Sequence, residues 1–259
     1  PGHSATADWV FAQLKPYADE VRVQRFSHTA AGQKLELRNI IARFNAAAPK
    51  VVLLAAHWDT RPLADMEVDR DKRAQPVPGA NDGASGVAVL LELARMFAKQ
   101  KPDVGVVMVF FDGEDYTAHP PSSANMFLGS KYYARHLEHL DSKTKQSIKY
   151  GILLDMVGDK NLRINPEMQS VEAAPEVVKL VWGAAKSLGY AEYFPTAARY
   201  SIADDHVPLI AAGVKCIDVI DFDYAYWHTL DDTVDKCAAK SLKVVGDVVA
   251  RVVYQEKTQ

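Results

Sequence analysis

Several features that are common in other protein classes are scarce in this sequence. It contains only two cysteines, Cys216 and Cys237, and they do not form a CxxC pair. Two thiols are too few for a disulfide scaffold, so we expect core residues, with one disulfide between them as the less favoured alternative. No GxGxxG, GxxxxGK[ST] or GxSxG motif is present, which argues against a dinucleotide enzyme, a P-loop nucleotidase and a serine hydrolase.

Long apolar runs and a strong charge of one sign are also missing. The longest apolar runs have the length of a strand, well below the roughly 20 residues of a membrane-spanning helix. Thirty Lys and Arg residues face 33 Asp and Glu residues, and the scattered basic residues argue against nucleic-acid binding. With 259 residues and 48% hydrophobic content, the chain can bury a full core, and we expect one catalytic domain over 1–259. No basic and apolar leader precedes the first helix, so we expect any export signal to have been removed.

Short, continuously apolar runs are what the sequence has instead. They begin at Val51, Val104, Tyr150 and Val214, and such runs are typical of strands buried on both faces. Two alternating segments around Ala31 and Gly32 predict an antiparallel strand pair. The predicted helices cover 4–20, 84–98, 129–139, 175–188 and 235–254, and the strand pair covers 20–26 and 34–44. This order predicts an α/β fold, a three-layer α/β/α sandwich with a mixed, mostly parallel central sheet.

Acidic and imidazole side chains gather where the predicted strands end. His57 follows the first buried strand, Asp82 begins the next helix, and Glu114 and Asp115 follow the second buried strand. The later strands contribute Asp155, Asp204 and His228. Each residue alone has an ordinary explanation, such as Asp82 capping its helix, but the carboxyl ends of parallel strands share one edge of the sheet. So many carboxylates need a cation, and oxygen and nitrogen ligands without thiolate suit Zn²⁺ in an open catalytic site.

Two further segments carry charge or glycine without indicating chemistry. The run 65–73 mixes acidic and basic residues, which is typical of a solvated surface loop. Gly83 and Gly86 begin the helix after Asp82. We interpret them as close packing of that helix on the sheet rather than as a phosphate-binding loop.

The order of motifs resembles the zinc-dependent aminopeptidase clan with its α/β exopeptidase fold, and within it the glutaminyl-peptide cyclotransferases of animals and bacteria. The resemblance is carried by His57-Trp58-Asp59, Gly79-Ala80-Asn81-Asp82, Phe111-Asp112-Gly113-Glu114-Asp115, Leu154-Asp155, Asp204-Asp205-His206-Val207-Pro208 and Trp227-His228-Thr229. It implies one zinc ion held by three ligands, which are Asp82, Asp115 and His228. In the two-metal peptidases, His57 and Asp155 match ligands of the second ion.

The same resemblance implies roles for the remaining residues. Glu114 matches the general acid and base, Asp155 and Asp204 match its supporting carboxylate network, and Trp227 matches a wall of the substrate pocket. The neighbouring Phe222 and Tyr224 suit the same apolar wall. The chain departs from the family at Asp115, where Glu is more common, and in the absence of a Trp over 116–127. Both departures concern the shape of the pocket.

The activity implied by the resemblance is cyclisation of an N-terminal glutaminyl residue to pyroglutamyl, with release of ammonia from peptide substrates. The alternative is a two-zinc aminopeptidase that uses His57, Asp82, Asp115, Asp155 and His228 as ligands and Glu114 to activate a water molecule. A third interpretation is a binding module without catalysis, but such a module has no need for an unliganded Glu114 beside a metal. Because bacterial relatives are commonly exported, the resemblance also implies a periplasmic or secreted protein.

Overall fold

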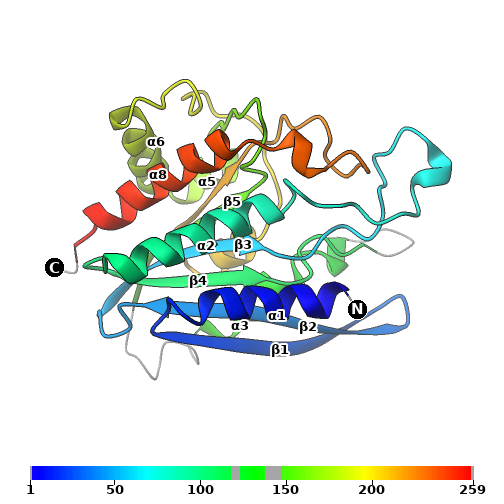
Figure 1. The fold of residues 1–259 in the computed structure, drawn as a ribbon, viewed down its shortest axis with the longest axis horizontal. Helices are drawn as coiled ribbons and strands as arrows, with labels where there is room; N and C mark the ends of the chain where they lie inside the picture. Colours follow the sequence, from blue (N-terminus) through cyan, green and yellow to red (C-terminus); the bar gives the residue numbers. More distant parts are fainter. Residues whose placement is uncertain (1, 118–122, 138–146, 258–259) are drawn as a thin grey trace.

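Six strands in the described part of the chain form a single mixed sheet. A computed structural model describes residues 2–117, 123–137 and 147–257, and Figure 1 shows the fold. The strand order is β1-β2-β4-β3-β5-β6. The strand bounds are β1 Glu20–Ala30, β2 Gln33–Phe44, β3 Lys50–His57, β4 Gly105–Phe111, β5 Ser147–Asp155 and β6 Cys216–Ile220. β3 to β6 pair in parallel and β2 pairs antiparallel with both neighbours, which confirms the mixed, mostly parallel sheet.

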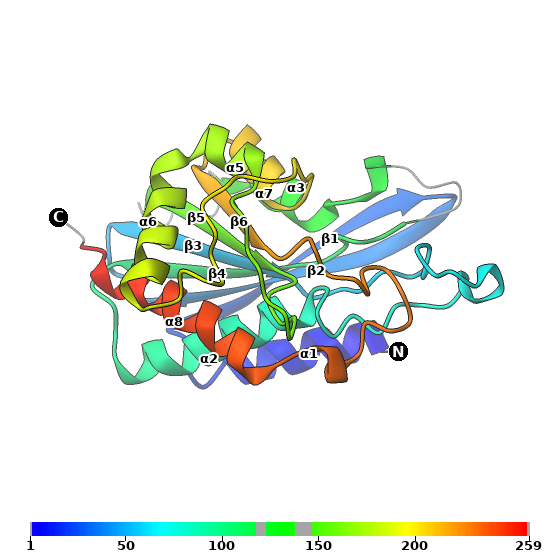
Figure 2. The ribbon, with the colours of Figure 1, turned by 90° about the horizontal axis from the view of Figure 1, so that it is seen from above.

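Helices cover both faces of this sheet, as Figure 2 shows. One face carries α1 Gly2–Leu14, α2 Ala84–Lys99, α6 Pro175–Ser187 and α8 Ala239–Gln255. The other face carries α3 Leu128–Arg135 and α7 His206–Ala211, and α5 Met168–Ala173 contacts β6. Single 3-10 turns occur at η1 Arg70–Lys72, η2 Ser123–Asn125 and η3 Val234–Lys236. The predicted three-layer sandwich is therefore confirmed, and none of the described helices is long and apolar enough to cross a membrane.

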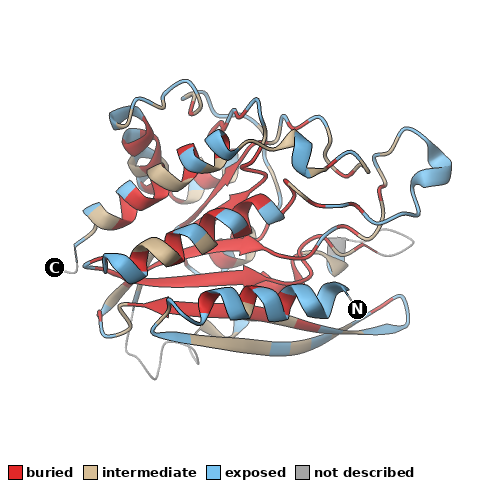
Figure 3. Ribbon diagram, viewed as in Figure 1, coloured by how far each residue is buried: buried red, intermediate tan, exposed pale blue. Residues whose placement is uncertain are grey.

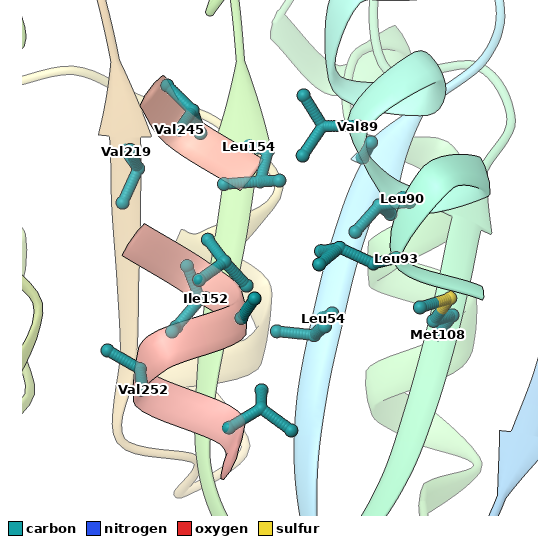
Figure 4. Close-up of a cluster of buried hydrophobic side chains, with 14 of the residues drawn as sticks. Leu54, Val89, Leu90, Leu93, Met108, Ile152, Leu154, Val219, Val245 and Val252 are labelled. Atoms are coloured by element: carbon teal, nitrogen blue, oxygen red, sulfur yellow. The ribbon is translucent and has the colours of Figure 1, made fainter. Parts of the chain in front are cut away.

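The middle parts of the central strands are apolar, as expected for strands that helices cover on both sides. Every residue of β4 is buried, and so are the residues of β3 after Lys50 (Figure 3). In the larger core cluster, Leu54 and Leu154 from the sheet pack against Leu90 of α2 and Val245 of α8 (Figure 4). This rigid centre fixes the strand ends, where the polar residues lie.

Glycine residues explain one turn and one close contact in this fold. Ala31 and Gly32 both have positive φ angles, 48° and 76°, and they join β1 to β2 as a two-residue hairpin loop. Gly86 faces the sheet so closely that an added Cβ would lie 2.2 Å from the carbonyl oxygen of Leu154. The interpretation of Gly86 as a close-packing residue is confirmed.

Some predicted bounds were wrong. The first helix ends at Leu14 rather than at residue 20, because Pro16 lacks an N–H donor and disfavours helix in the residue before it. Trp9 of this helix is exposed. The third predicted helix, 129–139, is Leu128–Arg135, and residues 138–139 lie outside the described part of the chain.

The two cysteines are free in the structure. Cys216 is buried in β6, as expected of a core thiol, and Cys237 is half-buried. The alternative of a disulfide between them is therefore not what the structure shows.

Candidate functional site

One pocket lies at the carboxyl ends of β4, β3, β5 and β6, and its empty volume is about 350 Å³. Its polar lining consists of residues that the sequence singled out, namely Asp82, Glu114, Asp115, Asp155, Asp204 and His228. Its apolar lining consists of Met126, Met156, Ile202, Ala203, Ile220, Phe222 and Trp227. The strand ends therefore bring the predicted polar residues together with an apolar wall.

Three buried side chains in this pocket are arranged as metal ligands. Asp82, Asp115 and His228 each offer one ligand atom, and these atoms lie within 4.8 Å of one another. His228 Nε2 lies 3.3 Å from Asp115 Oδ1 and 3.6 Å from Asp82 Oδ2. Asp115 Oδ2 is buried without a hydrogen-bond partner, which is costly unless a cation meets it. Two carboxylates and one imidazole fit a catalytic zinc ion with an open position.

The turns that carry these ligands are held by two other carboxylates. Asp59 accepts the backbone N–H groups of Glu114 and Asp115 at 3.1 and 3.2 Å. Asp232 accepts those of Asn81 and Asp82 at 2.9 and 3.2 Å. Each turn is thus fixed by a side chain far away in the sequence, a support that sequence reasoning did not identify.

His57 lies next to Asp82 and contacts several carboxylates. Its Nε2 atom is 3.1 Å from both Asp82 Oδ1 and Asp155 Oδ1, and its Nδ1 atom is 3.8 Å from Glu114 Oε2. Burial lowers the pKa of His57, but the charges of Glu114 and Asp155 raise it well above its ordinary value. His57, Asp82 and Asp155 also form a second group of atoms that could hold a metal ion.

Glu114 is buried beside the candidate ligands. Burial raises its pKa well above the ordinary value, the charges of Asp115 and Asp204 raise it further, and His57 opposes them. The pKa of Asp204 rises to about 7 through burial and the charge of Asp155. A carboxyl with a raised pKa can hold a proton at neutral pH and then release it, which acid–base chemistry requires.

The apolar wall is formed by only two of the three predicted aromatic residues. Trp227 stacks on His228 with ring centres 3.8 Å apart, and Phe222 meets Trp227 edge-on at 5.3 Å. Tyr224, expected in the same wall, does not line the pocket. Its hydroxyl donates instead to Asp232 at 2.7 Å, so it supports the turn that carries Asp82.

Arg61 is a buried residue of the site that sequence reasoning missed. It donates to Asp115 Oδ1 at 2.7 Å and makes two hydrogen bonds to Asp65, at 2.9 and 2.7 Å. The interpretation of 65–73 as a solvated run was wrong for Asp65. No local pattern in the sequence distinguishes Arg61 from a surface arginine, because its two partners come within hydrogen-bond distance only in the folded chain.

A second set of buried charges lies next to the pocket. His206 Nε2 is 3.3 Å from Glu167 Oε2, and its Nδ1 atom is 3.9 Å from Asp218 Oδ2. Burial, together with the charges of Asp204 and Asp155, raises the pKa of Asp218 well above its ordinary value. This cluster connects α5, α7 and β6 to Asp204 in the pocket.

Comparison with known proteins places these residues in a family. A model described as Peptidase family M28 matches residues 39–253, a range that contains the whole pocket. The glutaminyl-peptide cyclotransferase of Drosophila melanogaster is 30% identical, over 89% of this chain and 68% of its own length. The chain spans 61–68% of the length of the first curated cyclotransferases that it matches.

Solved structures resemble the chain over more of its length. Glutaminyl cyclase of Bacteroides thetaiotaomicron, bound to N-acetylhistamine, is 37% identical with a TM-score of 0.93, and the match covers 98% of this chain and 90% of that one. A leucine aminopeptidase precursor of the same organism is 38% identical with a TM-score of 0.93, over 98% and 89%. The zinc exopeptidase-like α/β fold is therefore confirmed.

Proposed function

Because this chain belongs to peptidase family M28, we propose that its pocket cyclises N-terminal glutaminyl residues of peptides to pyroglutamyl and releases ammonia. The observation that carries the proposal is the pocket itself. Glu114 is buried, belongs to none of the candidate ligand groups among the described residues, and lines the same pocket as Asp82, Asp115, His228 and the apolar wall. Similarity to glutaminyl cyclases over nearly the whole chain supports this choice within the family.

We infer that one zinc ion binds to Asp82, Asp115 and His228. The chemistry that zinc supplies when bound is polarisation of a carbonyl oxygen. The γ-carbonyl of the substrate glutamine would face these three ligands, which line the same pocket as Glu114.

Glu114 acts as the proton carrier in this mechanism. Its carboxylate takes a proton from the attacking α-amine and gives it to the leaving amide nitrogen, so one residue serves both steps. The C–N bond of the side-chain amide breaks as the ring C–N bond forms, and ammonia leaves. The charges of Asp115 and Asp204 raise the pKa of Glu114, and Asp155 acts on Asp204 in turn, which favours the protonated form of Glu114 between the two transfers.

The apolar wall holds the reacting conformer and limits the access of water. Trp227 and Phe222 meet edge-on, and Ile202 and Ile220 continue the apolar surface. Ring closure is intramolecular, so positioning the α-amine near the γ-carbonyl supplies much of the acceleration. Excluding water from the same space suppresses hydrolysis of the amide.

The test combines activity with metal content. We expect Glu114→Gln to retain zinc and to lose about 10²–10⁴-fold in kcat on a Gln-initiated dipeptide, measured as loss of ammonia by mass spectrometry. The exposed Glu92→Gln on α2 is the matched control and should keep full activity. Full activity in E114Q would refute the assignment.

A two-zinc aminopeptidase is the second candidate, because His57, Asp82 and Asp155 form a further group of possible ligands. Two zinc ions per chain together with release of free N-terminal amino acids would favour it over the cyclase. One zinc ion with pyroglutamyl product would favour the cyclase.

We also propose that residues 1–259 act as one catalytic domain that works in the periplasm or outside the cell. One sheet collects all the described strands, which supports the first statement. The second statement extends the expectation that the sequence resemblance gave. Fractionation of expressing cells followed by immunoblotting would test the location.

A further inference from the structure

We infer that Arg61 and Asp65 form a hydrogen-bonded pair that positions two zinc ligands, Asp115 and His228. Each residue of the pair touches one ligand, and the two are hydrogen-bonded to each other. Neither is among the residues that line the pocket, and each acts through a ligand, so both are positioning residues. The inference rests on the proposed zinc site, but it does not depend on which reaction the site performs.

Arg61 determines which oxygen of Asp115 is free to bind the metal. Its Nη1 atom donates to Asp115 Oδ1 at 2.7 Å, and Oδ2 is left buried without a hydrogen-bond partner. Because guanidinium is planar and stays charged, it holds a carboxylate in a defined orientation. With the short side chain of aspartate at this position, one oxygen is fixed by Arg61 and the other remains for zinc.

Asp65 acts on the second ligand from the opposite side. Its Oδ1 atom lies 3.5 Å from His228 Nδ1, while His228 Nε2 faces Asp82 and Asp115 at 3.6 and 3.3 Å. A carboxylate at the outer nitrogen of a ligating histidine orients the ring and increases its basicity. Asp65 is itself fixed by two hydrogen bonds from Arg61.

Two hydrogen bonds from backbone N–H groups strengthen the connection between the Asp65 loop and the His228 segment. Met66 N–H donates to the carbonyl oxygen of His228 at 3.3 Å, and Leu230 N–H donates to Glu67 Oε2 at 3.1 Å. Residues 65–67 therefore contact residues 228–230 at three successive points. The loop after β3 holds the segment that carries His228, although the two are far apart in the sequence.

Charge explains why an arginine is suited to this position. Asp65, Asp82 and Asp115 place three carboxylates around His228, and Arg61 is 7% exposed between two of them. Arg61 forms ion pairs with Asp65 and Asp115 at 2.7 Å each, and a guanidinium keeps its charge throughout the pH range of folded proteins. A permanent cation that is not itself a ligand reduces repulsion among the carboxylates without competing for zinc.

The experiment measures zinc affinity by competition with a chromophoric chelator, using metal-free chain refilled with zinc. We expect Arg61→Gln to weaken zinc binding about 10–100-fold, as removal of such supporting residues typically does. Asp65→Asn should weaken it in the same direction, and the double variant should lose little more than Arg61→Gln alone, because the two residues act as one unit. Arg70→Gln is the matched control, because Arg70 is an exposed arginine of the same loop, and it should bind zinc as the wild-type chain does.

Arg61→Lys keeps the charge but cannot bind both carboxylates as a fork, so its zinc affinity should lie between those of the wild-type chain and Arg61→Gln. If Arg61→Gln does not fold, as judged by circular dichroism, Arg61→Lys decides the question. Wild-type affinity in the folded variants would overturn the inference. If zinc binding depends on Arg61 in this way but the wild-type chain forms no pyroglutamyl product, the proposed function alone is refuted.

Discussion

Replacing Glu167 by Gln removes a buried charge that fixes the wall of the pocket. The Glu167 carboxylate, 1% exposed, accepts the backbone N–H groups of Gln169 and Ser170 at 2.7 Å each, at the start of α5. It also accepts the N–H of Ile202, a residue of the pocket, at 3.1 Å, and its Oε2 atom lies 3.3 Å from His206 Nε2. Gln keeps the size of the side chain but has neither its charge nor its second oxygen.

The size of the effect follows from the pKa of this carboxyl. Burial alone would raise it, but His206 and the backbone N–H donors lower it to about 2, from an ordinary value of 4.5. At about 1.4 kcal/mol per pH unit, this shift stabilises the folded chain by about 3 kcal/mol at pH 7. Because the folded-state pKa is the lower one, this stabilisation is complete above pH 4.5 and is lost as the pH falls toward 2.

Urea unfolding at two pH values tests this reasoning. We expect the free energy of unfolding of E167Q to lie about 3 kcal/mol below that of the wild-type chain at pH 7, and about 1 kcal/mol below it at pH 3. Glu172→Gln, an exposed change in the same helix, should stay within about 0.5 kcal/mol at both pH values. Equal losses for E167Q at the two pH values would refute the role of the charge, and no loss at pH 7 would refute the buried contacts as a source of stability.

Two further predictions concern packing and the thiols. Gly86→Ala should lower the free energy of unfolding by about 1–3 kcal/mol, because its Cβ would meet the Leu154 carbonyl oxygen at 2.2 Å, and a variant of wild-type stability in urea would contradict that close approach. Gly183→Ala on α6, with no atom within 4 Å of the new Cβ, should instead gain up to about 1 kcal/mol. Without reductant, both thiols should react with an aromatic disulfide reagent in denaturant, and half-buried Cys237 should react before buried Cys216 in the folded chain. A chain with no reactive thiol would show that the two are bonded.

Much of the site could be predicted because strand ends are visible in the sequence. Apolar runs that are buried on both faces end abruptly in polar residues, as β4 does before Glu114 and Asp115. Parallel pairing then brings such ends together, whatever the length of chain between them. Asp82, Asp155 and His228 reach one pocket for this reason.

The parts that were missed depend on long-range contacts or on short elements. Arg61 and Asp65 lie in a loop without periodicity, and only the folded chain brings them to Asp115 and His228. The six-residue helices α5 and α7 are too short for a helical pattern to be distinguished from an irregular segment. The sequence neighbours of Tyr224 predict a place in the pocket wall, but its hydroxyl donates to Asp232 and the residue does not line the pocket.

The β1–β2 hairpin lies at one edge of the sheet, and this edge affects how copies of the chain associate. β1 is an edge strand, the first in the order, so one side of its backbone has no neighbouring strand among the described residues. A long open edge can pair with a second copy and begin aggregation. Glu20, Arg22 and Arg25 lie along this strand, and charges of this kind oppose such pairing. These side chains therefore matter for solubility, a property that the chemistry of the pocket does not determine.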